Sequence, residues 1–426
     1  MRESKEHKMK VLVYILIFTS FFGDNLIGVE VGGVQLTLFR ALWGAIGILC
    51  VANRHSELVV YRGKNAYSVI FMVFWLVWGV SSLLWAIDVG NWVRIIFFMM
   101  VGIISIIIFN NVFKEKKDII HAFWAFQSGV VVQAIIGWYE IFTKDYHFAN
   151  INESFINYYI KRENRIPIAM CGNPNNFATL MFVGVFVSYI CIKTSKSKVS
   201  KAVQACILIS DALLLVKTGS RANIIGLVLA TLIILIMWRA HNNKKLIFHC
   251  AVVMSLFCGC VCVLMLRNTY NGVLVFGTNS DSIRINLIKN GLLFLIQTFG
   301  LGTGAGQIES WMGLKALYDT QGILNMHNWW GEILTAFGIT IFIGYLLFYV
   351  KMFKDNFIIY KNIKDRELSA ISLSMCGILA GYTIASVSAS SNMTNESLWI
   401  FWAISIAYQG IANQSNFFKS KLCCNI

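Results

Sequence analysis

The feature that most constrains this chain is a series of apolar segments of about 17–22 residues, each almost free of charge. A helix needs about 20 residues to cross a hydrocarbon layer roughly 30 Å thick, and lipid offers no partner to backbone N–H and C=O groups. The composition agrees: 57% of the residues are hydrophobic, 13% are charged, and the mean hydropathy is +0.65. Soluble domains have about 45–50% apolar and about 25% charged residues. The sequence therefore predicts an all-α, polytopic integral membrane protein and excludes a soluble fold.

About twelve membrane-spanning helices are predicted, forming one integral membrane domain over residues 1–426. Two long segments remain between the spans: residues 143–173, and residues 267–329 between the ninth and tenth spans. The first span is followed by no small-residue cleavage site, so we do not expect it to be a signal peptide. The expected spans are Val11–Glu30, Gly33–Ala52, Ala66–Ala86, Asn91–Asn110, Ile119–Phe142, Pro174–Ile192, Ala202–Val216, Ser220–Trp238, Leu246–Leu266, Trp330–Val350, Leu368–Ser388 and Ser397–Ile411.

The distribution of Lys and Arg predicts the orientation in the membrane. If the N-terminus is cytoplasmic, every inside segment carries at least two basic residues, as the positive-inside rule requires. Both termini are then cytoplasmic, and the two long segments lie on the outer side of the membrane. The net charge of +15 is explained by this cytoplasmic face and by contact with the lipid bilayer, so no nucleic acid partner is expected.

Several basic residues are predicted to lie at the outer surface, where even-numbered spans begin. The eighth span begins with Ser220 and Arg221 and the tenth follows His327 and Asn328, while Arg284 lies in the long segment between them. Helix N-termini carry partial positive charge, so these helix starts and the two guanidinium groups together predict a site for a multiply charged anion.

Two further arginines, Arg40 and Arg94, also lie near outer helix starts. They either join the anion site or extend toward the membrane surface, as long basic side chains do at such boundaries.

The two external segments have features that membrane insertion does not require. In the first, Asn173 is expected to cap the next helix, with Pro174 in its first turn. In the second, two amphipathic stretches, 281–296 and Gln307–Tyr318, flank a sequence with glycine at alternate positions, 300–306. Such a glycine run is suited to a tight backbone passage near a ligand.

Five ordered motifs carry a resemblance to a known family. They are Lys217-Thr-Gly-Ser-Arg221-Ala-Asn, Asp281-Ser-Ile-Arg284 with Asn290-Gly-Leu, Gly302-Thr-Gly304-Ala-Gly306-Gln, His327-Asn328 followed by Gly338, and Gly172-Asn173-Pro174-Asn175-Asn176. With the predicted topology, this set resembles the O-antigen ligase and polymerase family of bacterial envelope proteins. In the family, nine residues separate the His-Asn pair from a glycine, and Gly, Thr or Tyr follows three positions after that glycine. Here Gly338 is the glycine, but Ile341 occupies the last position.

The resemblance implies a membrane glycosyltransferase with a GT-C-like arrangement of helices. Its donor would be a glycan on undecaprenyl pyrophosphate at the outer leaflet, and other polysaccharide-assembly proteins would be partners. The family's functional arginines map onto Arg221 and Arg284, and its histidine maps onto His327. We expect Arg221, Arg284 and Asn328, with Arg40 and Arg94, to bind the substrate.

The residues are consistent with a metal-free, inverting transfer that needs no cofactor. The external segments contain no Asp-x-Asp or Glu-x-Asp pair of the kind that holds Mg²⁺ or Mn²⁺ in metal-dependent transferases. Arg221 and Arg284 would stabilise the charge on the leaving phosphate, and His327 would be the general base. Glu309 or Glu332 is the alternative base.

Three functions are considered. A polymerase would join lipid-linked repeat units, and it is favoured because the external segment shows no separate domain for recognising another acceptor. A ligase would use the same chemistry on another acceptor. A flippase or transporter is expected to show internal repeats and ionisable residues at mid-membrane, and the chain shows neither clearly.

Overall fold

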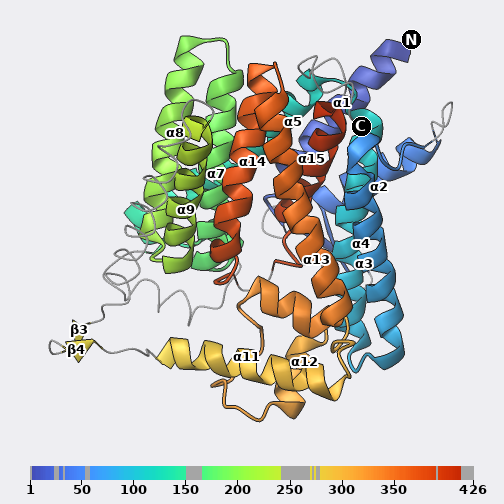
Figure 1. Cartoon of the computed structure of the whole chain (residues 1–426), viewed down its shortest axis with the longest axis vertical. Helices are drawn as coiled ribbons and strands as arrows, with labels where there is room; N and C mark the ends of the chain where they lie inside the picture. Colours follow the sequence, from blue (N-terminus) through green and yellow to red (C-terminus); the bar gives the residue numbers. More distant parts are fainter. Residues whose placement is uncertain are drawn as a thin grey trace.

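A computed structural model describes residues 2–23, 28–31, 34–52, 58–149, 166–240, 269–270, 273–274, 279–389 and 392–413. Long helices run side by side as a bundle, and α11 and α12 lie across one end of it, here called the loop end (Figure 1). The helices are α1 (Arg2–Thr19), α2 (Leu38–Ala52), α3 (Ala66–Ser81), α4 (Val89–Val112), α5 (Lys116–Thr143), α7 (Pro174–Thr194), α8 (Lys198–Lys217), α9 (Arg221–Ala240), α11 (Asn279–Gln297), α12 (Ile308–Lys315), α13 (Trp329–Asn362), α14 (Arg366–Ala385) and α15 (Glu396–Ala412). Short 3₁₀ turns are η1 (Gly63–Asn65), η2 (Ser82–Trp85) and η3 (Ala169–Cys171), and the strands are β1 (Gly28–Val31), β2 (Val34–Thr37), β3 (Thr269–Tyr270) and β4 (Val273–Leu274).

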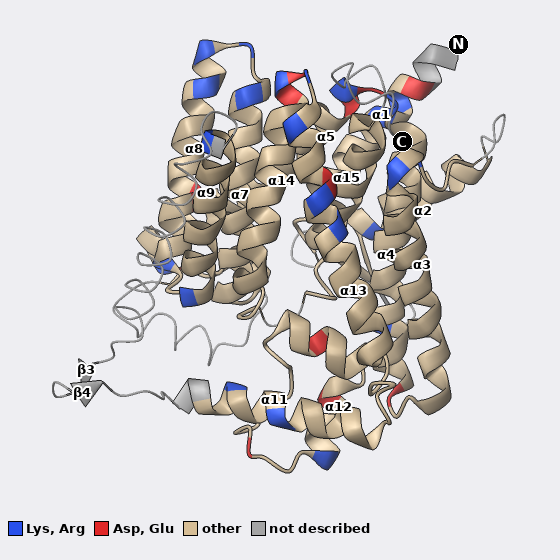
Figure 2. Cartoon of the chain, in the orientation of Figure 1, with Lys and Arg blue, Asp and Glu red and all other residues tan. Residues whose placement is uncertain are grey.

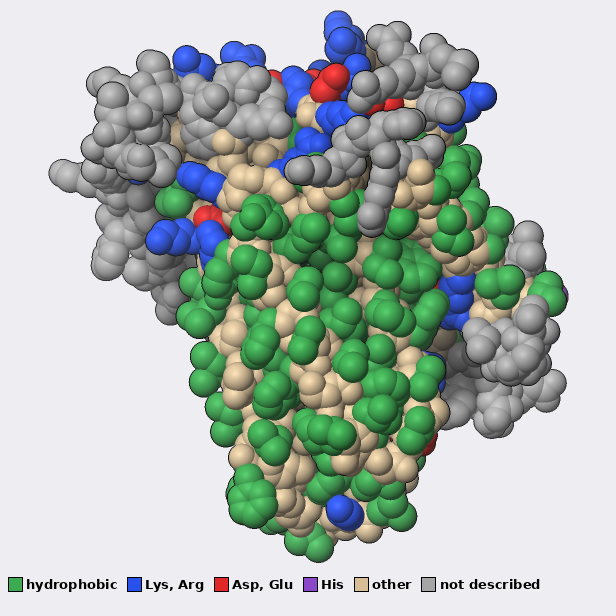
Figure 3. Space-filling model, turned by 90° about the vertical axis from the view of Figure 1, so that its right-hand side faces the viewer, with side chains coloured by type: hydrophobic (Ala, Val, Ile, Leu, Met, Phe, Trp, Pro, Cys, Tyr) green, Lys and Arg blue, Asp and Glu red, His purple; other side chains and the backbone are tan. Residues whose placement is uncertain are grey.

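The protein is an all-α, multi-pass membrane protein, as predicted. Among the described residues, eight helices are long and apolar enough to cross a membrane, and α2 is a shorter apolar helix. Hydrophobic side chains cover a broad band on one face of the bundle (Figure 3). Many Lys and Arg residues gather at the end opposite the loop end, where α1 begins (Figure 2). Bands of this kind match a bilayer core between polar surfaces.

All the predicted spans except the ninth overlap a described helix; the ninth, Leu246–Leu266, lies outside the described residues. Most of the predicted external segment 143–173 also lies outside them. In the other external segment, the two amphipathic stretches form α11 and α12.

The boundaries predicted for the first two spans are wrong. Helix α1 ends at Thr19, and the expected continuation to Glu30 is replaced by the antiparallel pair β1–β2, in which Gly28 is opposite Thr37. Glycine is a poor helix former, and β-branched residues such as Val29 and Val31 favour strands, so local preference outweighs hydrophobicity here.

Polar side chains fix the helix starts that face the loop end. Asn173 accepts a hydrogen bond from the Asn175 N–H at 2.8 Å, with Pro174 in the first turn, which confirms the predicted cap. Asp88 caps α4 through the Asn91 N–H at 2.9 Å. These caps satisfy N–H groups that the helix itself leaves without partners.

The glycine-rich sequence docks into a break in α13. Gly338 has φ of +79° and interrupts the helix, so its neighbours lose part of the usual hydrogen-bond ladder. The backbone of residues 300–304 supplies the partners: Thr303 N–H donates to Thr335 O at 2.8 Å, and Ile339 N–H donates to Gly300 O at 2.9 Å. The predicted tight backbone passage is therefore present, and its partner is a helix.

We expect Gly338→Ala to destabilise the protein by about 2–5 kcal/mol. A side chain at this positive φ is strained, and its Cβ would overlap the backbone of Gly300 and Leu301. Gly313→Ala on α12 is the matched control, because its Cβ would meet nothing within 4 Å. Thermal unfolding of the two variants in detergent micelles measures the difference; equal midpoints would contradict this account of the break.

Candidate active site

The first turn of α13 lies at the loop end, directly after two of the predicted site residues, His327 and Asn328. Asn328 caps the helix, with its side-chain oxygen accepting from Trp330 N–H at 3.1 Å and Gly331 N–H at 3.2 Å. His327, just before it, has φ of +45°, a left-handed conformation that costs a non-glycine residue free energy. Such strained residues concentrate at functional sites.

His327 and Arg284 are close enough to interact electrostatically. Burial lowers the pKa of His327 from its ordinary value of 6.5, the positive charge of Arg284 adds to the effect, and the pKa falls to about 4. The imidazole is therefore neutral near pH 7. It has a free nitrogen lone pair and a single N–H.

Arg221 lies at the start of α9, and a polar network joins this helix to the end of α14. Asn223 donates to the Ser388 hydroxyl at 3.1 Å, and the Ser220 and Ser388 hydroxyls are 3.2 Å apart. The same end of α14 holds α13, because Trp329 N–H donates to Ser386 O at 3.1 Å. The turn that ends α14 therefore sets Arg221 and His327 in a common framework.

Helix α7 joins this framework through its first turns. The Thr179 hydroxyl donates to Asn223 Oδ1 at 3.1 Å, within a buried network. The predicted motifs around Asn173 and Arg221, which are far apart in the sequence, are thereby brought to the same end of the bundle.

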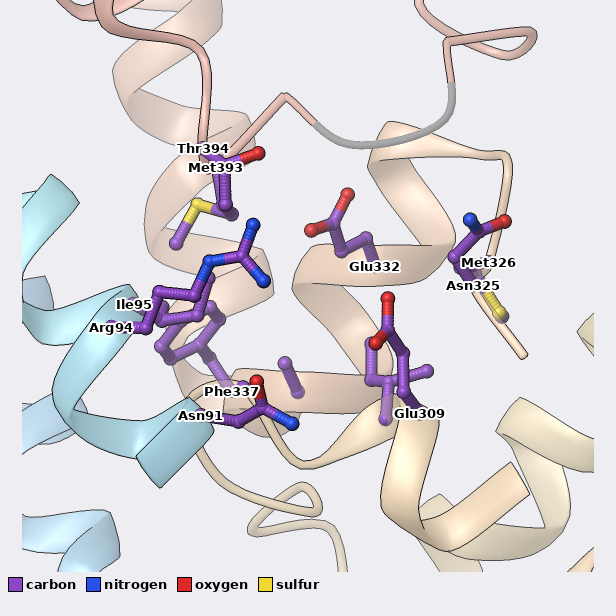
Figure 4. A pocket seen from close by; sticks show the side chains of 13 residues that line it. Asn91, Arg94, Ile95, Glu309, Asn325, Met326, Glu332, Phe337, Met393 and Thr394 are labelled. Atoms are coloured by element: carbon purple, nitrogen blue, oxygen red, sulfur yellow. The ribbon is translucent and has the colours of Figure 1, made fainter. Parts of the chain in front are cut away.

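On another side of α13 lies a cavity of about 110 Å³, here called the chamber. Arg94 reaches into it from α4, Glu309 from α12 and Glu332 from α13 (Figure 4). The chamber is lined further by Asn91, Ile95, Gly306, Ile308, Asn325, Met326, Ala336, Phe337, Met393 and Thr394. Among the described residues, the ionisable side chains that line it are one arginine and two glutamates.

The chamber walls are held together by Gln307, which is fully buried. Its side-chain oxygen accepts from the N–H groups of Ile87 and Asp88, both at 2.8 Å, and its amide nitrogen donates to Asp88 O at 2.7 Å. These bonds fix the start of α12, which bears Glu309, against the start of α4, which bears Arg94. Glu332 accepts a hydrogen bond from the Asn392 backbone N–H, so the segment before α15 closes another side.

A larger cavity of about 850 Å³ adjoins the chamber, and Arg94 and Thr394 line both. Arg40 and Glu396 also line it, as a salt bridge with Nε and Oε1 2.9 Å apart. The guanidinium carbon of Arg40 lies 5.6 Å from the ring centroids of both Phe97 and Phe98. Other lining residues are Ser20, Phe21, Gly23, Gln35, Gly90, Val93, Met170, Cys171, Gly172, Asn176, Leu180, Asn395 and Ser397.

The structure therefore groups the predicted site residues in two sets. Arg284, His327 and, through the end of α14, Arg221 form one set. Arg40 and Arg94 share the larger cavity, and neither Arg221, Arg284 nor His327 is among the residues that line the chamber or that cavity. Asn328 acts as a helix cap.

Sequence reasoning did not single out Glu396 or the segment 392–397, and it named Glu309 and Glu332 only as alternative bases. A charged residue in the first turn of a hydrophobic helix was the available signal for Glu396. In the part of the chain that the structure describes, no group of three His, Cys, Asp or Glu side chains is arranged to hold a metal ion.

Comparisons with known proteins agree with the motifs. The family described as O-antigen ligase matches residues 205–349, which run from α8 to α13. The chain is also 26% identical over 428 residues to the teichuronic acid biosynthesis protein TuaE of Bacillus subtilis (strain 168), covering 97% of this chain and 86% of that protein. The predicted resemblance to an O-antigen ligase/polymerase-like family is confirmed by these findings.

The pKa of His327 predicts how stability depends on pH. Because the folded state lowers this pKa to about 4, the unfolded chain takes up the proton first as the pH falls below about 6.5. The free energy of unfolding should therefore decrease as the pH falls from 6.5 to 4, in part because of His327. His327→Gln should remove the contribution of this residue to the decrease. Unfolding midpoints measured from pH 7 to pH 4, with the exposed His147→Gln as control, test this. The same pH dependence in unmodified protein and His327→Gln would contradict it.

Proposed function

We propose that the chain is a membrane glycosyltransferase that joins lipid-linked oligosaccharide repeat units into a surface polysaccharide. The family likeness and the relative in teichuronic acid biosynthesis support a polysaccharide polymerase or ligase of the cell envelope. The observation that carries the proposal is the placement of His327 close to Arg284 just before α13, together with the contacts by which the end of α14 joins α13 to the helix that begins with Arg221.

The donor in this proposal is a glycan on undecaprenyl pyrophosphate. A pyrophosphate needs several positive groups at the membrane surface, and the positive dipole ends of α9 and α13 add to the charge of the arginines. Arg221 and Arg284 bind the phosphates by charge-assisted hydrogen bonds. The loop end faces the outer leaflet, and the basic opposite end faces the cytoplasm of a bacterial cell.

The reaction is a direct displacement with inversion. An acceptor hydroxyl oxygen forms a bond to the anomeric carbon, the bond from that carbon to the phosphate oxygen breaks, and its electron pair passes to the pyrophosphate. The hydroxyl proton goes to His327, whose neutral imidazole can accept it. The arginines stabilise the charge that develops on the leaving group, so the step needs no metal ion or cofactor.

The acceptor distinguishes a polymerase from a ligase. We favour the polymerase, because the residues of the external segment that the structure describes form the short strands β3 and β4, the helices α11 and α12 and turns, and these residues include no separate recognition domain. A ligase would pass the glycan to another acceptor by the same step. Other polysaccharide-assembly proteins are proposed as partners.

The orientation is tested with reporter fusions. Fusions at Lys64, Lys198 and Lys361 should report the cytoplasm, and a fusion at Asp319, in the turn after α12, should report the outside. A cytoplasmic Asp319 would put the site on the wrong face of the membrane for a donor on the outer leaflet.

Substitutions at the donor site are expected to stop polymer formation without preventing insertion. Arg221→Ala or Arg284→Ala should reduce turnover by about 10²–10³-fold, the usual cost of removing one preorganised donor. Arg221→Lys or Arg284→Lys should retain only part of the normal turnover, because an ammonium group lacks the planar guanidinium that bonds a phosphate through two N–H groups. His327→Ala should reduce turnover by roughly 10²–10⁴-fold. Lys217→Ala, an exposed cation near the start of α9, is the matched control.

The measurement is the lipid-linked glycan that accumulates in cells carrying each variant. Single repeats on undecaprenyl pyrophosphate indicate a polymerase, and long lipid-linked chains indicate a ligase. If a well-expressed His327→Ala variant makes a near-normal amount of polymer, His327 is not the general base, and Glu309 or Glu332 remains as the alternative base. Near-normal polymer from both arginine variants would reject the donor site.

A further inference from the structure

Arg94 lies where the chamber and the larger cavity meet. It belongs to the second turn of α4, and both cavities count it among their lining residues. Its guanidinium points into the chamber toward Glu332 (Figure 4). A ligand that extends from one cavity to the other must therefore pass this side chain.

Arg94 differs from the neighbouring Arg40 in its bonding. Arg40 has a salt bridge to Glu396 and donates to Gln35 O at 2.7 Å. Among the described residues, Arg94 forms neither a hydrogen bond nor an ion pair, although two glutamates line the same chamber. Its five N–H donors are thus available to a ligand with oxyanion character.

The charges divide unequally on the two sides of Arg94. The chamber side of Arg94 is lined by the carboxyl groups of Glu309 and Glu332, whose oxygen atoms can accept hydrogen bonds from hydroxyl groups. Among the described residues that line the larger cavity, Arg40 and Glu396 neutralise each other in a salt bridge, and Arg94 is the cation that has no ion-pair partner. An anionic group is therefore favoured on that side.

The sizes agree with a chain of several units. A volume of about 850 Å³ lies within the range of about 300–1,000 Å³ typical of ligand pockets, and the chamber, with about 110 Å³, is smaller than that range. Asn176 and Asn395, which carry amide groups, and the aromatic residues Phe97 and Phe98 line the larger cavity. Polar amides with aromatic surface suit sugars, which present both hydroxyl edges and apolar ring faces.

We propose that the larger cavity binds an acidic glycan, with Arg94 holding the carboxylate of a uronic acid unit while hydroxyl groups of the next unit enter the chamber and donate to Glu309 and Glu332. This inference rests on the proposed glycosyl transfer and assigns its acceptor subsite. The donor pyrophosphate stays at Arg221 and Arg284. Arg94 then selects acidic acceptors through a contact that takes no part in bond breaking.

Binding to the full-length protein in lipid nanodiscs tests the proposal without any turnover. The probes are a tetrasaccharide of alternating glucuronic acid and N-acetylglucosamine, the same tetrasaccharide with its carboxyl groups reduced to alcohols, and inorganic pyrophosphate. The unmodified protein should bind the acidic tetrasaccharide more tightly than the reduced one. Arg94→Ala should weaken the acidic tetrasaccharide by roughly 10- to 100-fold, the usual worth of a charged hydrogen bond, and abolish the preference.

Two further variants make the result specific. Arg94→Lys should keep part of the preference, because the charge remains. Lys315→Ala should keep all of it, since this exposed cation stacks on Trp311 at 3.6 Å and lines neither cavity. Equal affinity of unmodified protein for the two tetrasaccharides, or an unchanged preference in Arg94→Ala, would overturn the proposal.

Binding of inorganic pyrophosphate shows whether Arg94 contacts the pyrophosphate of the donor or the carboxylate of the acceptor glycan. Arg94→Ala should leave pyrophosphate binding unchanged, and Arg221→Ala should weaken it. If Arg94→Ala weakens pyrophosphate and leaves the tetrasaccharide unchanged, Arg94 belongs to the donor and the inference is wrong. A failure of the proposed function would appear elsewhere, as normal polymer in cells carrying the Arg221 and Arg284 variants.

Discussion

The structure of the loop end depends on the backbone of residues 300–304 docked into the break of α13. Hydrogen bonds from Thr303, Gly304 and Ile339 replace those that the helix loses at Gly338, so the break is stable only with this partner. Unpaired backbone groups at such a depth would be costly, and glycine alone permits two backbones to approach this closely. The docked segment leads directly to Gln307 and α12, and it thereby sets the distance between the start of α13 and the start of α4.

Because of this constraint, the first turn of α13 has different neighbours on its two sides. On one side, His327 lies near Arg284, within the framework that includes the start of α9. On the other side, Glu332 faces the chamber with Glu309 and Arg94. The proposed transfer has to bring two substrates to one bond, and a single rigid helix start between the proposed donor and acceptor sites would meet that requirement.

The sequence was most informative where lipid imposes a rule. Span length and the need for internal hydrogen bonds predict α4, α5 and α7 almost to their ends, and capping chemistry predicts the start of α7 at Asn173 and Pro174. The rule failed at β1 and β2, where glycine and valine outweighed hydrophobicity. Arg40 and Arg94, which the sequence places near helix starts, line one cavity, and their binding of substrate stays a prediction.

The composition of the two cavities was not predictable in this way. Arg40 and Glu396 are 356 positions apart, and nothing local to either residue indicates their salt bridge. The chamber requires α4, α12 and α13 to be placed by Gln307 and by the glycine-rich segment, which is a property of tertiary packing. The lowered pKa of His327 likewise comes from burial beside a residue on another helix, whereas sequence alone suggested an imidazole titrating near neutrality.

The central claim is that this single chain transfers glycan from a lipid pyrophosphate. The most direct measurement is product formation by the purified protein in liposomes that contain undecaprenyl-pyrophosphate-linked repeat units and EDTA, with no other protein added. Longer lipid-linked glycans of inverted anomeric configuration should form, with one undecaprenyl pyrophosphate released for each glycosidic bond made. Repeat units that only move between leaflets without any new glycosidic bond, or bond formation that stops in EDTA and resumes with Mg²⁺, would contradict it.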